Sequence, residues 1–266
     1  MSAAVDGTGY LSSEDDRLFD AHLYIAAMGR SGSTYLANLL TTPPKRWVMV
    51  EPWFVNGLFN RFIRDRAAEF GWPIDVQHWH LPAPMRTRAA FLERYRSFLA
   101  PKLNELERWG AKGVRADFHI PTITTINPRN MIVLVRDLRQ VSLSLLEKNH
   151  RQGKKEEENR RWVELYVAEN AQSLLKLCEI KLVDALRVVR YEDVSRSASE
   201  KRAIETWLDW PMDGDEFANL EDFGRGYEVE RHTSPELVER QLPSGADDFV
   251  AKICEQNSSY QDRFGY

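Results

Sequence analysis

One short stretch, in which an apolar run meets a glycine-rich turn and then a helical pattern, constrains the fold of this chain more than any other feature. It reads YIAAMGRSGSTYLANLL and occupies residues 24–40. The apolar start predicts a buried strand, and Leu36, Leu39 and Leu40 fall on one face of the helix that follows. A strand, a glycine turn and a helix start bring backbone N–H groups and a positive helix end to one point. The stretch therefore predicts a loop that binds a phosphate or a similar anion.

Other short apolar runs alternate with helical patterns along the chain. We expect buried strands at residues 22–28, 47–50, 110–116, 131–136 and 185–191, and helices at about 33–41, 54–70, 87–108, 119–126, 138–150, 157–178 and 195–208. This alternation predicts an α/β fold, a doubly wound parallel sheet flanked by helices. We expect residues 1–20 to be a flexible acidic lead-in, residues 21–266 to form a single α/β domain, and the charged stretch 151–161 to be a surface loop.

Charge is unevenly distributed along the chain, although the formal net charge is −4. Residues 1–20 and 211–266 together carry 18 acidic and 6 basic residues, whereas residues 21–210 carry 22 acidic and 30 basic residues. A nucleic-acid-binding protein would show a more extreme basic excess. The moderate excess in residues 21–210 therefore favours a local pocket for a small anionic ligand. No apolar stretch approaches the ~20 residues that cross a bilayer, so we expect a cytoplasmic protein without a membrane span.

The glycine loop lacks the lysine that nucleotide-hydrolysing enzymes carry at this place. Their pattern GxxxxGK[ST] aligns with residues 27–34, and Ser33 occupies the lysine position. Because that lysine reaches the β- and γ-phosphates, its absence argues against hydrolysis of a triphosphate. Arg30 lies inside the loop instead, where its guanidinium can neutralise an anion. The six histidines are dispersed and form no cluster with metal-ligand spacing, so we expect no metal site.

A second anion-binding element follows a later strand. The stretch MIVLVRDLRQVSLSLL at residues 131–146 runs from an apolar strand into a helix, with Arg136 at the strand end and Ser144 eight residues later. Open α/β folds bind their ligands at the carboxyl edge of the sheet. We therefore expect Arg136 to lie near the glycine loop.

Three segments in order resemble the sulfotransferases that use 3′-phosphoadenosine 5′-phosphosulfate (PAPS). GRSGSTYL is similar to their 5′-phosphosulfate loop, VRDLRQVSLS to their 3′-phosphate element, and RYEDV to a segment after a late strand. The resemblance spans residues 29–194 and is closer to the carbohydrate-type branch, with its RSGST loop and Glu-Pro segment. It implies the P-loop-like sulfotransferase fold, PAPS as cofactor without a metal, and cofactor contacts from Gly29, Arg30, Ser31, Gly32, Ser33, Thr34, Tyr35, Arg136, Ser144 and Tyr191. In the C-terminal part, Arg225, Arg231 and Ser234 are further candidates.

The resemblance implies in-line transfer of a sulfuryl group from PAPS to a hydroxyl of a saccharide, a glycolipid or a small metabolite. Arg30 and the loop N–H groups would stabilise charge on the leaving group, at ~3 kcal/mol for each well-placed donor. The favoured general base is Glu51, because the run MVEPWF resembles the Glu-Pro segment of carbohydrate-type enzymes. The alternative is His80, in the run HWHLPAP, since sulfotransferases acting on phenols and steroids use a histidine in a similar setting.

Residues between the two anion-binding elements are the candidates for acceptor binding. We expect them to be Trp53, Trp79, His80, Arg115 and Asp117; Lys112 and His119 belong to the same run, KGVRADFH, and Trp72 and Trp109 are further indoles in this region. Flat apolar faces stack on indole rings, although core packing is the commoner use of tryptophan. Surface ion pairing explains the charged residues almost equally well.

Two other functions remain open from the sequence. A P-loop kinase-like enzyme shares the strand, loop and helix of the opening stretch and would bind ATP with Mg²⁺. A non-catalytic nucleotide-binding module would use Glu51 only structurally. Neither the acceptor nor the oligomeric state follows from the sequence.

Overall fold

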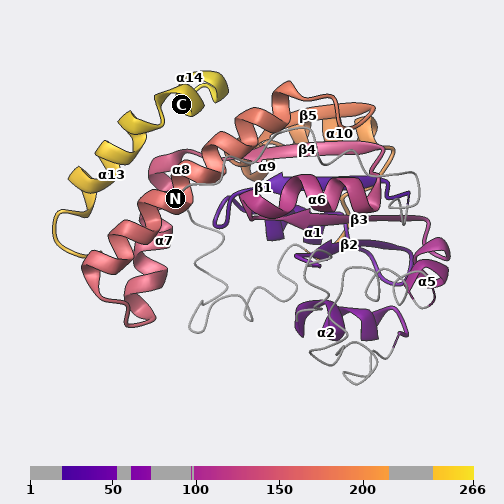
Figure 1. Ribbon diagram of the computed structural model, residues 1–266. Coiled ribbons are helices and arrows are strands. Elements are labelled where there is room, and N and C mark those ends of the chain that lie inside the picture. Colours follow the sequence, from indigo (N-terminus) through magenta and orange to yellow (C-terminus); the bar gives the residue numbers. More distant parts are fainter. Residues whose placement is uncertain (1–19, 53–60, 73–96, 98, 216–241) are drawn as a thin grey trace.

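A five-stranded sheet forms the centre of the computed structural model, which describes residues 20–52, 61–72, 97, 99–215 and 242–266. The strands are β1 (Leu23–Ala27), β2 (Arg46–Val50), β3 (Arg108–Gly113), β4 (Asn130–Val135) and β5 (Ala185–Arg190). Their order is β2-β3-β1-β4-β5, and each neighbouring pair is parallel (Figure 1). This arrangement confirms the predicted α/β fold with a doubly wound parallel sheet.

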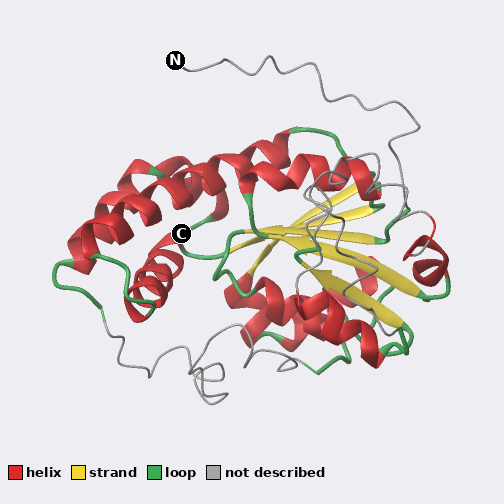
Figure 2. Cartoon of the chain, turned by 60° about the horizontal axis from the view of Figure 1, so that its bottom comes forward, coloured by secondary structure: helices red, strands yellow, loops and turns green. Residues whose placement is uncertain are grey.

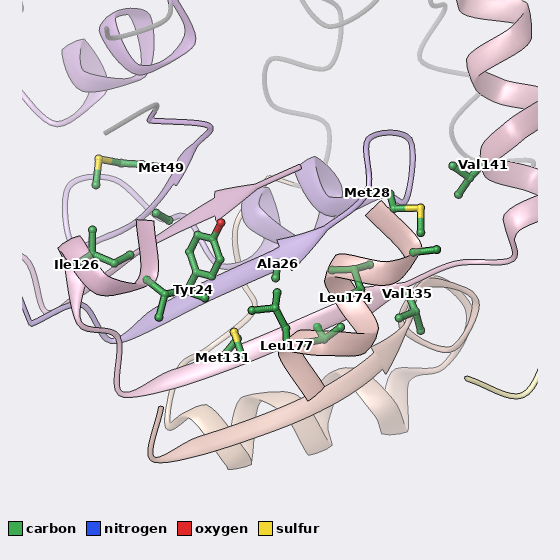
Figure 3. Packing of buried hydrophobic residues seen from close by; sticks show 14 of the residues in the cluster. Tyr24, Ala26, Met28, Met49, Ile126, Met131, Val135, Val141, Leu174 and Leu177 are labelled. Carbon is green, nitrogen blue, oxygen red and sulfur yellow. The ribbon is translucent and has the colours of Figure 1, made fainter. Parts of the chain in front are cut away.

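Side chains of β1 alternate between two apolar layers, one on each face of the sheet. All five residues of the strand are buried, as expected for a parallel strand covered on both faces. Tyr24 and Ala26 belong to one layer, and Leu23, Ile25 and Ala27 belong to the other. Figure 3 shows the first layer, where the side chains of helix α8 pack over the strands.

Helices cover both faces of the sheet (Figure 2). The layer of Tyr24 contains residues of α6 (Ala116–Ile126), α7 (Leu138–Arg151) and α8 (Glu156–Glu179). The opposite layer contains residues of α1 (Ser33–Leu39), α9 (Tyr191–Arg196) and α10 (Ala198–Leu208). Two further helices, α2 (Arg61–Glu69) and α5 (Ala100–Asn104), contribute to the first layer. Among the described helices, none has the length and apolar character needed to cross a membrane.

The described C-terminal residues, 242–266, form two helices that the sequence patterns did not predict. They are α13 (Ala246–Gln256) and α14 (Ser258–Phe264). Helix α13 contacts α7 and α8, and α14 contacts α8, so both lie beside that helical pair (Figure 1). Their apolar side chains, including Val250 and Ile253, extend the layer of Tyr24.

Several predicted boundaries are wrong. Strand β3 ends at Gly113 rather than at residue 116, because α6 begins at Ala116. The predicted helix 87–108 is wrong at its end, since Arg108 begins β3; residues 87–96 lie outside the described part. The stretch 151–161, predicted to be a surface loop, is a loop only between the end of α7 at Arg151 and the start of α8 at Glu156.

Two local signals explain the other differences in helix boundaries. Helix α8 begins inside the predicted loop because Glu156, Glu157 and Glu158 place negative charge in its first turn, where it interacts favourably with the helix dipole. The predicted helix 195–208 is divided at Ser197, whose side chain accepts a hydrogen bond from the backbone N–H of Glu200 and so begins a new helix.

The carboxyl ends of the five parallel strands lie at one edge of the sheet. Strands β3 and β2 lie on one side of β1, and β4 and β5 lie on the other. The chain therefore reverses its direction of winding at β1, and such a switch point is where open α/β sheets bind ligands. The glycine loop begins at this point, directly after Ala27.

Candidate functional site

The glycine loop after β1 has a backbone that ordinary residues rarely adopt. Arg30 has φ 70° and Gly32 has φ 82°, both in the left-handed region. A Cβ atom on Gly32 would lie 2.1 Å from the ring of Tyr191, so only glycine fits between the loop and α9. Strained backbone of this kind concentrates at binding sites, where the surrounding structure holds it in place.

The two arginine elements predicted from the sequence meet directly. The Nε of Arg30 donates to Oγ of Ser144 at 2.9 Å. Nη1 of Arg136 donates to the carbonyl oxygen of Arg30 at 2.9 Å. These bonds join the loop after β1 to the end of β4 and to α7, and they place both guanidinium groups at the same edge of the sheet.

Tyr166 of α8 supports the start of the loop, and the sequence patterns did not single it out. Its hydroxyl accepts a hydrogen bond from the N–H of Gly29 at 2.8 Å and donates to the carbonyl oxygen of Val114 at 2.7 Å. The ring stacks on Trp162, with 4.9 Å between ring centroids. A tyrosine in the middle of a long helix gives no sequence signal that separates this role from core packing.

A pocket of about 300 Å³ opens beside Arg136. Its wall includes Gln140, Arg190, Tyr191, Arg196 and Tyr266, and its volume is at the lower end of the range for small-molecule sites. The Nε atoms of Arg136 and Arg190 are buried and have no hydrogen-bond partner within the described part of the chain. Buried donors without partners are costly, so this wall suits an anionic ligand that accepts from them.

The C-terminal helices hold one wall of this pocket, which the sequence patterns did not reveal. The buried hydroxyl of Tyr260 accepts from the N–H of Arg136 at 3.3 Å and donates to its carbonyl oxygen at 3.2 Å. The hydroxyl of Tyr266 donates to Glu192 at 2.8 Å, and the guanidinium of Arg190 lies 4.4 Å from the Tyr266 ring. The sequence candidates Arg225, Arg231 and Ser234 lie outside the described residues.

Glu51 lies at the end of β2, on the opposite side of β1 from this pocket. Its φ is 52°, and one of its carboxylate oxygens accepts from Nζ of Lys112 at 2.8 Å. Lys112 is buried in β3, and the backbone N–H of Glu51 donates to its carbonyl oxygen at 2.9 Å. The carboxylate is therefore fixed at the sheet edge, where it lines a small pocket with Pro52 and Arg115.

The remaining sequence candidates for acceptor binding separate into three groups. Arg115 and Asp117 are exposed and form a bidentate ion pair with each other, at 3.1 Å and 2.7 Å. Trp72 and Trp109 are buried in the core, the commoner of the two uses that the sequence left open for them. The last group lies outside the described residues and consists of Trp53, Trp79 and the alternative base His80.

His119 is a core residue, unlike its exposed neighbours Arg115 and Asp117 in the same run. The side chain is fully buried in α6, and the Tyr24 hydroxyl lies 2.8 Å from its Nδ1. Burial lowers the pKa of His119 to about 4, and the negative charge of Asp117 opposes this effect only in part. The imidazole is therefore neutral at physiological pH.

The described residues contain no group of three or more His, Cys, Asp or Glu side chains that could hold a metal ion. Around the pocket on the β4 and β5 side, three cations, Arg136, Arg190 and Arg196, outnumber the two carboxylates, Asp137 and Glu192. This distribution favours binding of an anion by guanidinium groups and backbone N–H groups.

Three solved structures resemble this chain in fold. A sulfotransferase domain from the olefin synthase of Synechococcus has a TM-score of 0.54 and 17% identity, covering 91% of this chain and 96% of that one. A sulfotransferase domain from the curacin biosynthetic pathway has a TM-score of 0.52 and 17% identity, covering 91% and 98%. A sulfotransferase from Mycobacterium avium has a TM-score of 0.53 and 16% identity, covering 94% and 78%. No protein-family model and no curated protein matches the sequence.

Substitution of Tyr260 by phenylalanine should destabilise the wall of the pocket. Tyr260→Phe keeps the ring but leaves the buried N–H and C=O groups of Arg136 without their partner, at a cost of about 2 kcal/mol in the free energy of unfolding. Urea denaturation measures this change. Tyr266→Phe is the matched control, because it removes one bond to Glu192 and leaves Arg136 unaffected. Equal stability of Tyr260→Phe and wild type would contradict the role given to Tyr260.

Acidification should destabilise the fold through His119. The unfolded chain protonates this imidazole near its ordinary pKa of 6.5, whereas the folded chain does so only at about 4. Between these two pKa values only the unfolded state binds the extra proton. The free energy of unfolding therefore decreases as the pH is lowered, by ~3 kcal/mol in total. Urea denaturation of wild type and His119→Gln from pH 7 to pH 4 measures the difference. The variant should lose less stability, and parallel pH profiles would show that the assignment is wrong.

Proposed function

We propose, because this chain has the fold of sulfotransferase domains, that it transfers a sulfuryl group from PAPS to a hydroxyl of an acceptor molecule. The observation that carries the proposal is the junction of Arg30, Ser144 and Arg136. It joins a glycine loop suited to a 5′-phosphosulfate to a cationic pocket suited to the 3′-phosphorylated nucleoside. A donor with anionic groups at both ends of one ribose requires both features side by side.

The residues of the pocket fit the nucleoside half of this donor. Arg136 and Arg190 offer buried Nε donors without partners, and Arg196 adds positive charge at the rim. Ser144 stands beside Arg30, between this pocket and the loop. In this proposal, Arg136 and Ser144 bind the 3′-phosphate, and Tyr191 lies near the adenosine.

The loop residues would stabilise the leaving group. During in-line transfer, the bond between sulfur and the bridging oxygen breaks, and negative charge develops on the 5′-phosphate. In this proposal, the backbone N–H groups of residues 32–34, the hydroxyls of Ser33 and Thr34, and the guanidinium of Arg30 would donate to that charge, while the N–H of Ser31 donates to the carbonyl oxygen of Met28 at 3.3 Å. Donors that are already oriented before the reaction stabilise the transition state without further reorganisation.

Glu51 is the proposed general base. The Lys112 ammonium fixes one of its oxygens at the carboxyl edge of the sheet, two strands away from the glycine loop. The acceptor hydroxyl would lie between Glu51 and the loop and lose its proton to the carboxylate as its oxygen attacks sulfur. Space for a saccharide, a glycolipid headgroup or a small metabolite would then lie beside Arg115, which lines the pocket next to Glu51.

A nucleotide-binding module without activity is the second candidate, and the ion pair between Glu51 and Lys112 favours it. A carboxylate that compensates a buried ammonium has a structural role whether or not it acts as a base. A kinase-like enzyme is less well supported, because Ser33 occupies the position of the lysine that contacts a triphosphate. Binding and turnover experiments separate these functions.

Nucleotide binding should be selective and independent of metal ions. Isothermal titration calorimetry should show micromolar binding of adenosine 3′,5′-bisphosphate in the presence of a chelator, and no binding of ATP with Mg²⁺. Arg136→Ala should weaken the bisphosphate at least about tenfold, because a charge-assisted contact contributes about 1.5–3 kcal/mol. Arg108→Ala is the control, since Arg108 pairs with Asp209 at the start of β3, away from the carboxyl edge. Binding of ATP with Mg²⁺, without binding of the bisphosphate, would instead support a kinase-like enzyme.

Loss of the Glu51 carboxylate should slow turnover much more than it weakens donor binding. Glu51→Gln should lower kcat about 10²–10⁴-fold, because the acceptor proton loses its base. The rate is measured with ³⁵S-labelled PAPS and a library of hydroxyl acceptors, and donor affinity is measured by calorimetry. Glu107→Gln is the control, because this exposed residue pairs with Lys45. Full activity of Glu51→Gln would refute the assignment and make His80→Ala the next test.

A further inference from the structure

One face of α7 connects the cationic pocket with the glycine loop. Gln140, Ser144 and Lys148 are spaced four residues apart, so their side chains lie on the same face of the helix. All three are half-buried, whereas most of their neighbours on α7 are buried in the core. At 1.5 Å per residue, this face extends about 12 Å from Gln140 to Lys148.

Gln140 and Ser144, the first two residues of this face, lie beside parts of the site already described. Gln140 lines the cationic pocket beside Arg136. Ser144, one turn later, accepts the hydrogen bond from Arg30 of the glycine loop. The direction of α7 therefore leads from the proposed nucleoside pocket to the loop, and Lys148 lies one turn further in the same direction.

The charges around Lys148 agree with this position. Burial lowers the pKa of its ammonium, the positive charges of Arg30 and Lys154 lower it further, and the negative charge of Glu51 opposes them. The charges of the loop arginine and of the proposed base therefore both act on this ammonium. Its Nζ makes no hydrogen bond or ion pair with the part of the chain that the structure describes.

Two nearby lysines differ from Lys148 in this respect. Lys112 forms the ion pair with Glu51 at 2.8 Å. Lys154 lies over the ring of Trp162, with Nζ 4.5 Å from the ring centroid. Both cations have partners within the protein, so Lys148 is the better candidate for contact with a ligand.

We propose that Lys148 contacts the sulfuryl group during its transfer and replaces, from α7, the lysine that the glycine loop lacks. This inference rests on the proposed sulfotransferase activity. In the sequence, Ser33 occupies the lysine position of the related nucleotide-binding loops. A cation supplied by a helix that also contacts Arg30 through Ser144 restores positive charge at the reacting end of the donor.

The chemical step balances without any change in the protonation of Lys148. The acceptor oxygen forms a bond to sulfur, and its proton moves to the Glu51 carboxylate. The bond between sulfur and the bridging oxygen breaks, and its electron pair remains on the 5′-phosphate of adenosine 3′,5′-bisphosphate. The ammonium stabilises the negative oxygens of the sulfuryl group throughout and remains charged.

Comparison of two ligands that differ by the sulfuryl group tests this contact directly, without an acceptor. Isothermal titration calorimetry is carried out with PAPS and with adenosine 3′,5′-bisphosphate on the full chain. Lys148→Met should weaken PAPS about tenfold and change the affinity for the bisphosphate by less than about twofold, since one charge-assisted contact to the sulfuryl group is lost. Lys148→Arg should retain most of the PAPS affinity. Lys154→Met is the matched control and should leave both affinities within about twofold of wild type.

The possible results separate this inference from the proposed function. If wild type binds both ligands and Lys148→Met weakens neither, or weakens both equally, the contact to the sulfuryl group is refuted and the proposed function stands. If wild type binds neither ligand, both the Lys148 contact and the proposed function are refuted. Thermal denaturation of each variant checks folding, and Lys148→Gln provides the same test if Lys148→Met is unstable, because it also removes the charge. A loss of PAPS affinity in Lys148→Arg would contradict a purely cationic contact.

Discussion

The hydrogen bond from Arg136 to the carbonyl oxygen of Arg30 is the contact on which the whole site depends. It joins the end of β4 to the loop that follows β1, and these two strands are neighbours at the centre of the sheet. Because Arg30 in turn donates to Ser144 of α7, three segments far apart in the sequence form one cationic junction. In the proposed function, this junction makes the loop and the pocket two ends of a single anion site.

The surrounding structure maintains this junction from both faces of the sheet. Tyr191 packs against Gly32 on the α9 side, and Tyr166 holds Gly29 from α8. Tyr260 of the C-terminal helix holds the backbone of Arg136. These three tyrosines keep the strained loop and the strand end in place, which reduces the reorganisation needed when an anion binds.

The sequence was informative where a pattern is local and limited where function depends on long-range packing. The strand, glycine loop and helix around residues 24–40 and the position of Arg136 follow from local patterns, and the structure confirms the fold that they predict. The contacts of Tyr166 and Tyr260 and the proposed role of Lys148 could not be predicted, because each depends on how a distant helix packs against the sheet edge. The orientation of His119 could not be predicted for the same reason: its sequence neighbours are charged, but α6 turns it into the core.

A crystal structure of the complex with adenosine 3′,5′-bisphosphate would show whether a single nucleotide bridges the glycine loop and the pocket beside Arg136. The 5′-phosphate should lie within hydrogen-bond distance of the backbone N–H groups of residues 32–34, and the 3′-phosphate should lie on the guanidinium of Arg136. Electron density that places the two phosphates elsewhere, or that leaves the pocket of Arg136 and Arg190 without ligand, would contradict this mode of binding.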